Sequence, residues 1–133
     1  MITRVLILLV LASCEDHTSA GTYVGLEIRR TYSEPQSVKF EEELGKKITV
    51  TKESADVLRV DFARCWVKVH RPKQKVDSTW YVIDGSSCPS VAGDVKLGTG
   101  GLLVLDEKRV SLDVNGLTSD GTRVTIAFTG NKQ

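Results

Sequence analysis

The cysteines and histidines of this 133-residue chain are the residues best suited by type to nucleophilic, redox or metal chemistry. Their spacing gives no Cys-x-x-Cys redox pair, no Gly-x-Ser-x-Gly nucleophile motif and no Cys/His cluster for zinc. The carboxylates of Glu41, Glu42 and Glu43 are adjacent, and neighbouring strand residues point to opposite faces. That is poor geometry for an acid–base pair. The sequence therefore predicts a protein that is not an enzyme and uses no metal or cofactor.

Cys14 is the one residue to which the sequence assigns a specific chemical role. Met1–Arg4 carries one positive charge, and Val5–Leu11 is an apolar run of signal-peptide length, short of the roughly 20 residues that span a bilayer. The segment Leu11-Ala12-Ser13-Cys14 resembles the lipobox of bacterial lipoproteins, in which the Cys thiol is acylated. The resemblance implies a signal peptide over residues 1–13, a lipidated Cys14 with a polar tether over 14–21, and a folded domain over 22–133.

The anchor also predicts a location, with alternatives. Glu15 follows the Cys, and by resemblance to the enteric sorting rule it is not the Asp that retains lipoproteins at the inner membrane. We expect a bacterial cell-envelope protein, attached to the outer rather than the inner membrane. Cleavage after Ala20 would instead give a secreted soluble protein, and the apolar run could also be a buried first strand.

Cys65 and Cys88 remain as an even pair once Cys14 is assigned to the anchor. Such a pair in an exported chain predicts one disulfide, with two free buried thiols as the alternative. Removing residues 1–13 removes only Arg4 from the charged residues, which leaves 17 Lys and Arg against 17 Asp and Glu. A formally neutral domain argues against nucleic-acid binding, which normally needs a net basic domain.

Apolar and polar residues alternate with period two from residue 21 onward, as expected for strands with one buried face. Thr79–Ile83 and Leu102–Leu105 are more uniformly apolar, so we expect strands covered on both faces. The alternating segments are Val24–Ile28, Val38–Phe40, Ile48–Val50, Leu58–Phe62, Val67–Val69, Val110–Val114 and Val124–Phe128.

Turn residues separate these segments at intervals of about 8–12 residues, which is typical of an all-β sandwich or barrel. The predicted turns are Ser33–Pro35, Leu44-Gly45, Ser54–Asp56, Arg71–Lys73, Asp84-Gly85, Asp106–Lys108, Asn115-Gly116 and Asp120-Gly121, with a flexible hairpin at Gly98–Gly101. The short connections predict a single antiparallel meander barrel, or a strongly curved sheet, of about eight strands.

The opening segment Gly21–Gly25 and the closing segments Asp120-Gly121 and Ala127–Gly130 resemble those of small bacterial envelope proteins with lipocalin-like (calycin-type) β-barrels. The resemblance implies that the first and last strands pair to close the sheet. Tyr23 stands where the lipocalin Gly-x-Trp signature would place its Trp.

The expected activity is binding, either of a small apolar ligand or of an envelope partner protein. The alternative is a structural or interaction module without a ligand. Trp66, Trp80 and Tyr81 could line a pocket, or could be barrel core. The basic run that contains Lys68, His70 and Arg71 could contact anionic lipid headgroups or an acidic partner, or could be a solvated strand end.

Overall fold

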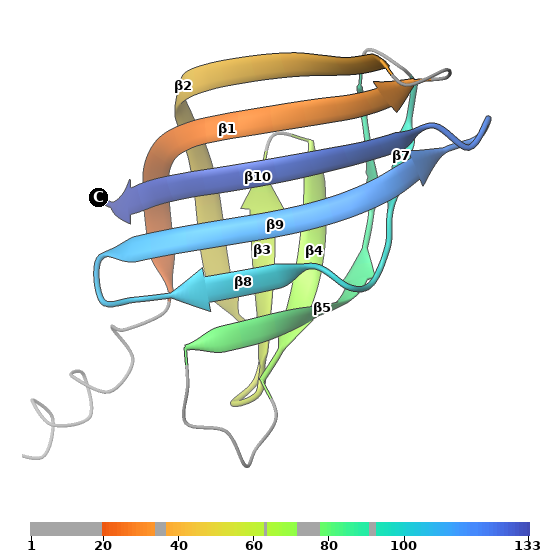
Figure 1. Ribbon diagram of the computed structural model, residues 1–133. Helices are drawn as coiled ribbons and strands as arrows, with labels where there is room; N and C mark the ends of the chain where they lie inside the picture. The colour runs from red at the N-terminus through yellow and green to blue at the C-terminus, as the bar shows by residue number, and fades with distance from the viewer. Residues whose placement is uncertain (1–19, 34–36, 63, 72–77, 91–92) are drawn as a thin grey trace, which may run out of the picture.

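The computed structural model describes residues 20–33, 37–62, 64–71, 78–90 and 93–133. Every regular element within these ranges is a β-strand, and the strands form one antiparallel sheet (Figure 1), which confirms the all-β prediction. In chain order they are β1 (Gly21–Ser33), β2 (Ser37–Lys52), β3 (Val57–Phe62), β4 (Cys65–His70), β5 (Thr79–Gly85), β6 (Ser87–Cys88), β7 (Val95–Leu97), β8 (Leu102–Leu105), β9 (Arg109–Thr118) and β10 (Arg123–Lys132).

The sheet closes on itself because the last strand pairs with the first. β10 pairs with β9 on one side and with β1 on the other, in a register that runs from Tyr23↔Lys132 to Tyr32↔Arg123. The result is a closed eight-stranded antiparallel barrel, consistent with the lipocalin-like architecture that the opening and closing segments implied. Closing the sheet pairs strand edges that would otherwise be open to other chains.

Ten strand segments make eight barrel strands because two of the strands are interrupted. β6 continues the path of β5 and β8 continues that of β7, since Tyr81↔Leu102 and Ser87↔Lys96 belong to one register. Against β9 the register shifts by two residues between β7 and β8, so Gly98–Gly101 forms a bulge. The hairpin expected at Gly98–Gly101 is therefore wrong, because the chain continues in the same direction.

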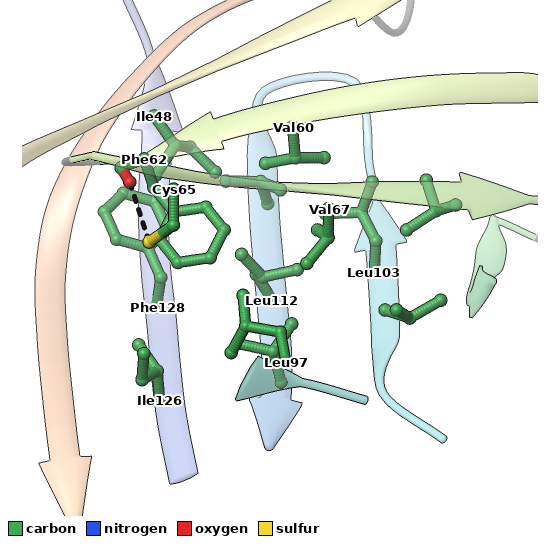
Figure 2. Packing of buried hydrophobic residues seen from close by; sticks show 14 of the residues in the cluster. Ile48, Val60, Phe62, Cys65, Val67, Leu97, Leu103, Leu112, Ile126 and Phe128 are labelled. Atoms are coloured by element: carbon green, nitrogen blue, oxygen red, sulfur yellow. Dashed lines mark hydrogen bonds between the residues drawn. The ribbon is translucent and has the colours of Figure 1, made fainter. Parts of the chain in front are cut away.

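Apolar side chains from every strand fill the barrel, and Figure 2 shows part of this core. In β9 and β10 alternate residues are buried, as the period-two pattern predicted. Burying a Val, Leu, Ile or Phe side chain contributes about 1.5–3 kcal/mol, so this core is the main source of stability. Its largest fully buried members include Tyr23, Phe128, Ile48, Leu58, Leu103, Leu112 and Ile126.

The barrel has two distinguishable ends. The chain enters β1 and leaves β10 at one end, which we call the entry end, where Tyr23 pairs with Lys132. The opposite end, here the far end, carries the β3–β4 turn, the β6–β7 connection and the β9–β10 turn. Tyr32 and Arg123 pair at this far end. The chain therefore enters the described structure at the end opposite to the β9–β10 turn.

The face of β1 that points into the barrel is the opposite of the predicted one. The apolar residues of Val24–Ile28 were expected in the core, but Glu27 and Arg29 pair with the buried Phe128 and Ile126 and so face the interior. Glu27 is only 6% exposed, and its carboxylate accepts a hydrogen bond from the Arg29 Nε at 3.1 Å. The prediction assumed that the apolar residues of β1 face the core. It failed because a buried charge is tolerated when it is paired.

β2 shows the same reversal in its first half. Val38 and Phe40 are about half exposed, although the alternation predicted them as buried. β3 pairs with β2 only from Ile48 to Lys52, so the first half of β2 extends past its neighbour (Figure 1). The alternation marks a strand correctly, but it cannot say which face meets the core.

Three dipeptides that were predicted as turns lie inside strands. Asn115-Gly116 is in β9, Asp84-Gly85 ends β5 and Leu44-Gly45 is in β2. At Leu44-Gly45 the register between β1 and β2 shifts, and Gly45 has a φ of +75°, as in a β-bulge. Pairing with neighbouring strands here overrides the local turn preference. The turns expected at Ser54–Asp56, Asp106–Lys108 and Asp120-Gly121 are confirmed.

The two uniformly apolar segments are not covered on both faces, as had been expected. Tyr81, Ile83, Leu102 and Val104 point outward from β5 and β8 and are each between 37% and 48% exposed. Their alternate neighbours, such as Trp80 and Leu103, fill the core. No helix among the described residues covers these strands, so their outer face is in contact with solvent.

The β9–β10 turn gives the first testable prediction. The Thr118 hydroxyl and the Thr122 backbone N–H both donate to the Asp120 carboxylate, which lowers the pKa of Asp120, with the Thr118 hydroxyl as the largest cause. A lowered pKa gives stability that is present above the ordinary Asp value of about 4 and is lost as the pH falls through the folded-state value. We expect Asp120→Asn to unfold at a lower temperature than the native protein at pH 7. The difference between the two proteins should begin to shrink at about pH 4 and disappear only once the pH is below the lowered folded-state pKa of Asp120. Thermal melts from pH 7 to pH 2 check this, and a difference that is constant with pH would contradict it.

Candidate ligand-binding groove

A groove crosses the outer wall of the barrel at the far end, over β6, β7 and β9. Its volume is about 720 Å³, within the range of small-molecule sites. It is lined by Ser87, Asp94, Lys96, Leu97, Gly98, Asn115, Gly116, Leu117, Thr118, Ser119 and Arg123.

The strand register builds a short row of side chains across this groove. Lys96 pairs with Leu117, and Leu117 pairs with Arg123, so the three residues lie side by side on β7, β9 and β10. All three are exposed on the outer face. An apolar side chain therefore lies between two cationic ones.

Leu117 and the bulge determine the shape of the groove. Leu117 is 55% exposed, while Leu97 beside it is buried and forms part of the core. The Gly98 backbone N–H donates to the Asn115 carbonyl oxygen at 3.0 Å, which fixes the start of the bulge against β9. Beyond it β8 continues in a shifted register. The interruption between β7 and β8 thus lies directly beside the groove.

Arg123, Lys96 and Asp94 are the charged residues that line the groove. The Arg123 guanidinium carbon lies 4.2 Å from the centroid of the Tyr32 ring, close enough for a cation–π contact. Lys96 adds a second positive charge and Asp94 a negative one. An apolar surface with two cations beside it suits a ligand with an apolar body and an anionic or polar end.

A second cavity lies on the inner face of the β1–β2 hairpin and has a different chemistry. It measures about 320 Å³ and is polar. Ion pairs join Glu27 to Arg29 at 3.1 Å and Glu43 to Lys46 at 2.6 Å. The Arg29 Nη1 also donates to the Pro89 carbonyl oxygen at 2.9 Å. This charged cavity does not suit an apolar ligand.

The structure confirms the Cys65–Cys88 disulfide. Cys65 is the first residue of β4 and Cys88 the last of β6, and their Cα atoms lie 5.1 Å apart. Both side chains are buried at the far end of the barrel. The disulfide joins the end of β6 to the start of β4, just before the connection that leads to Asp94 in the groove. Cys14 and the proposed signal peptide lie outside the described residues.

The aromatic residues that were singled out for a pocket are separated from one another. Trp66 is half-buried on the outer face of β4, with Arg59 at 4.8 Å and Lys68 at 5.8 Å from its ring centroid. Trp80 is buried in the core, with Arg71 at 4.8 Å from its ring centroid. Neither tryptophan lines the groove.

Within the described residues, Lys68 and Arg71 of the basic run contact other side chains of the same chain. The Lys68 Nζ lies 3.2 Å from a Glu53 carboxylate oxygen, and the Arg71 guanidinium lies over Trp80. His70 pairs in register with Tyr81 on the outer wall. Residues 72–77, which complete the run, lie outside the described residues. The structure brings Trp66, Lys68 and His70 onto one face of β4, away from the groove.

Sequence reasoning missed the groove, although one signal was present. Along β9 the even-numbered residues are buried and the odd-numbered ones exposed. Leu117 is the apolar residue at an exposed position of this pattern. Leu117 breaks the alternation of buried apolar and exposed polar residues, and the neighbouring strand is interrupted at the glycine-rich segment Gly98–Gly101. Together these two features could have indicated the site. The residues that the structure describes contain no group of three His, Cys, Asp or Glu side chains placed to hold a metal ion.

Comparison with protein-family models, curated proteins and solved structures finds no match for this chain. Within the described ranges, no helix has the length and apolar character needed to cross a membrane. The groove and the sequence are therefore the features that indicate a function.

Proposed function

We propose that this protein is a lipid-anchored protein of the bacterial cell envelope that binds a small, mainly apolar ligand in the groove. The observation that carries the proposal is the row Lys96, Leu117 and Arg123 across a groove of about 720 Å³. The apolar part of the ligand contacts Leu117, and a carboxylate or other anionic group reaches Lys96 or Arg123. Binding needs no catalytic group.

The arrangement of the two ends supports an anchored protein that binds away from its membrane. The chain enters β1 at Gly21, whereas Arg123 and the groove lie at the far end. A tether from Cys14 to Ala20 spans at most about 25 Å when fully extended, so the entry end would stay near the bilayer. The groove would then face the aqueous compartment, where a soluble ligand or carrier can reach it.

The groove is tested with two fluorescent probes, neutral N-phenyl-1-naphthylamine and anionic 1-anilinonaphthalene-8-sulfonate. We expect both to bind the native protein and Leu117→Asp to weaken both by tenfold or more, because a carboxylate replaces the apolar contact. Leu44→Asp is the matched control, since Leu44 is 81% exposed and lies outside the groove. Lys96→Gln should weaken the anionic probe more than the neutral one.

Two results would count against ligand binding. One is an equal loss of probe binding in the Leu117 and Leu44 variants, which would place the probes elsewhere. The other is no saturable binding by the native protein, which would favour the alternative of an interaction module without a ligand. Native mass spectrometry of protein purified from its own membrane gives an independent measurement. It reports both the acyl mass expected on Cys14 and any ligand that is retained.

A further inference from the structure

Within the described part of the chain, the first half of β2 has one edge that no strand pairs with. β2 pairs with β1 from Ser37 to Val50, apart from the bulge at Leu44-Gly45, but its other edge meets β3 only from Ile48 onward. Among the described residues, no strand pairs with this edge between Ser37 and Lys47 (Figure 1). An unpaired edge exposes a row of backbone N–H and C=O groups that can accept another strand.

The regular part of this open edge is short and has a defined midpoint. It begins at Ser37, the first residue of β2, and ends at Glu43, where the bulge at Leu44-Gly45 interrupts the strand. The middle residue of Ser37–Glu43 is Phe40, which is 50% exposed. Val38 beside it is 52% exposed. These exposed apolar side chains lie on an edge that also carries Lys39 and Glu41.

We propose that this edge is a dimer interface, in which the Ser37–Glu43 edges of two copies of the chain pair antiparallel about a two-fold axis at Phe40. Such an axis runs perpendicular to the joined sheet, so residues that face the same way are paired. Phe40 then lies opposite Phe40 of the second copy. Lys39 lies opposite Glu41 of the second copy, and Glu41 lies opposite its Lys39.

The charges of the edge fit this register. Lys39 and Glu41 lie on the same face of β2, opposite Thr31 and Arg29 of β1. Neither forms an ion pair with any described residue of its own chain. Glu41 also lines the polar cavity, whose lining holds four Glu side chains against Arg29 and Lys46. A lysine from the second copy would offset that excess of negative charge.

Other registers are less favourable. Moving the axis to Glu41 would place two Glu41 carboxylates opposite each other, and moving it to Glu42 would do the same for Glu42. Moving it toward Leu44 would run the pairing into the bulge. On the outer face, the Arg30 guanidinium lies 5.1 Å from the Phe40 ring centroid and holds the ring against β1. The two Phe40 rings then meet side by side across the axis.

Cysteine cross-linking in the native envelope tests the position of the axis. A residue on the axis lies opposite the same residue of the second copy. Phe40→Cys should therefore give a disulfide-linked dimer under mild oxidation. Val38→Cys is the matched control, because its exposure and outward direction are the same. The two Val38 positions would lie four residues apart along the strands, at about 13 Å, too far for a disulfide. Dimers at both positions or at neither would overturn the proposed register.

Charge exchange in the Phe40→Cys protein tests the pairing itself. Lys39→Glu should lower the dimer yield severalfold, because Glu then faces Glu41, and Glu41→Lys should do the same with two lysines. The double exchange should restore the yield, and so should co-expression of the two single variants. A dimer yield that stays the same in all of these charge variants would refute the pairing. Lys39 is exposed and Glu41 is partly exposed, so each variant should still bind the groove probes, which shows that it is folded.

Discussion

Replacing Cys65 and Cys88 together by alanine is expected to lower the free energy of unfolding by about 3 kcal/mol. The bridge closes a loop of 23 residues, and in the chain-entropy model that closure removes about this much conformational freedom from the unfolded chain. For a domain of this size the melting temperature should fall by roughly 10 °C or more. Alanine avoids the unsatisfied hydroxyl that serine would leave, because both side chains are buried.

Reduction of the native protein separates the effect of the cross-link from that of packing. A phosphine reductant breaks the bridge but leaves both sulfur atoms in place. We expect reduction in mild urea to reproduce most of the loss seen in the double variant. If the reduced protein unfolds at the same urea concentration as the oxidised one, the stabilisation comes from packing rather than from the bridge.

The bridge should also affect the groove. Cys88 ends β6, and the connection that follows leads to Asp94 and Val95 of β7. Ser87 and Asp94 lie on either side of this connection and both line the groove. Freeing β6 from β4 would loosen this wall. We therefore expect probe binding to weaken in the double variant at temperatures where the barrel is still folded.

Period-two alternation predicted where the strands lie but not which face they bury. For β3, β9 and β10 the apolar residues are in the core, since these strands are paired with neighbours on both edges. For β1 and the first half of β2 the faces are reversed. There the hairpin extends past β3, and paired charges such as Glu27 and Arg29 occupy the inner face. Such a reversal depends on strand length and register, which the local pattern does not contain.

The groove could not be assembled from the sequence for a similar reason. Its key residues lie on three different strands and meet only through the pairings Lys96↔Leu117 and Leu117↔Arg123. The register of Lys96↔Leu117 differs by two residues from that of β8 against β9, because of the bulge at Gly98–Gly101, which local turn chemistry predicted as a hairpin. In contrast, the disulfide was predictable because only one pair of cysteines remained once Cys14 was assigned to the anchor.

The glycines of the opening and closing segments now have a physical explanation. Gly25 pairs directly with Gly130 where β1 and β10 close the barrel. A Cβ atom on Gly25 would overlap the Thr129 carbonyl oxygen and the Gly130 Cα, and a Cβ on Gly130 would lie 2.7 Å from the Val24 carbonyl oxygen. The two backbones approach too closely for any side chain at this point. The segments that suggested pairing of the first and last strands therefore contain the contact that closes the sheet.

Gly25→Ala is accordingly expected to destabilise the protein by about 3 kcal/mol or more, because overlapping backbone atoms cannot rotate away as side chains can. Gly45→Ala is the matched control. Its φ of +75° makes alanine strained, but no atom lies within 4 Å of the added Cβ, so the loss should be only about 1–2 kcal/mol. Urea unfolding compares the two variants, and hydrogen exchange at Ala127–Thr129 reports opening between β1 and β10. Equal losses of stability in the two variants would mean that the close approach of Gly25 and Gly130 does not limit closure. A larger loss for Gly25→Ala, with faster exchange confined to β1 and β10, would identify this contact as the one on which the closed barrel depends.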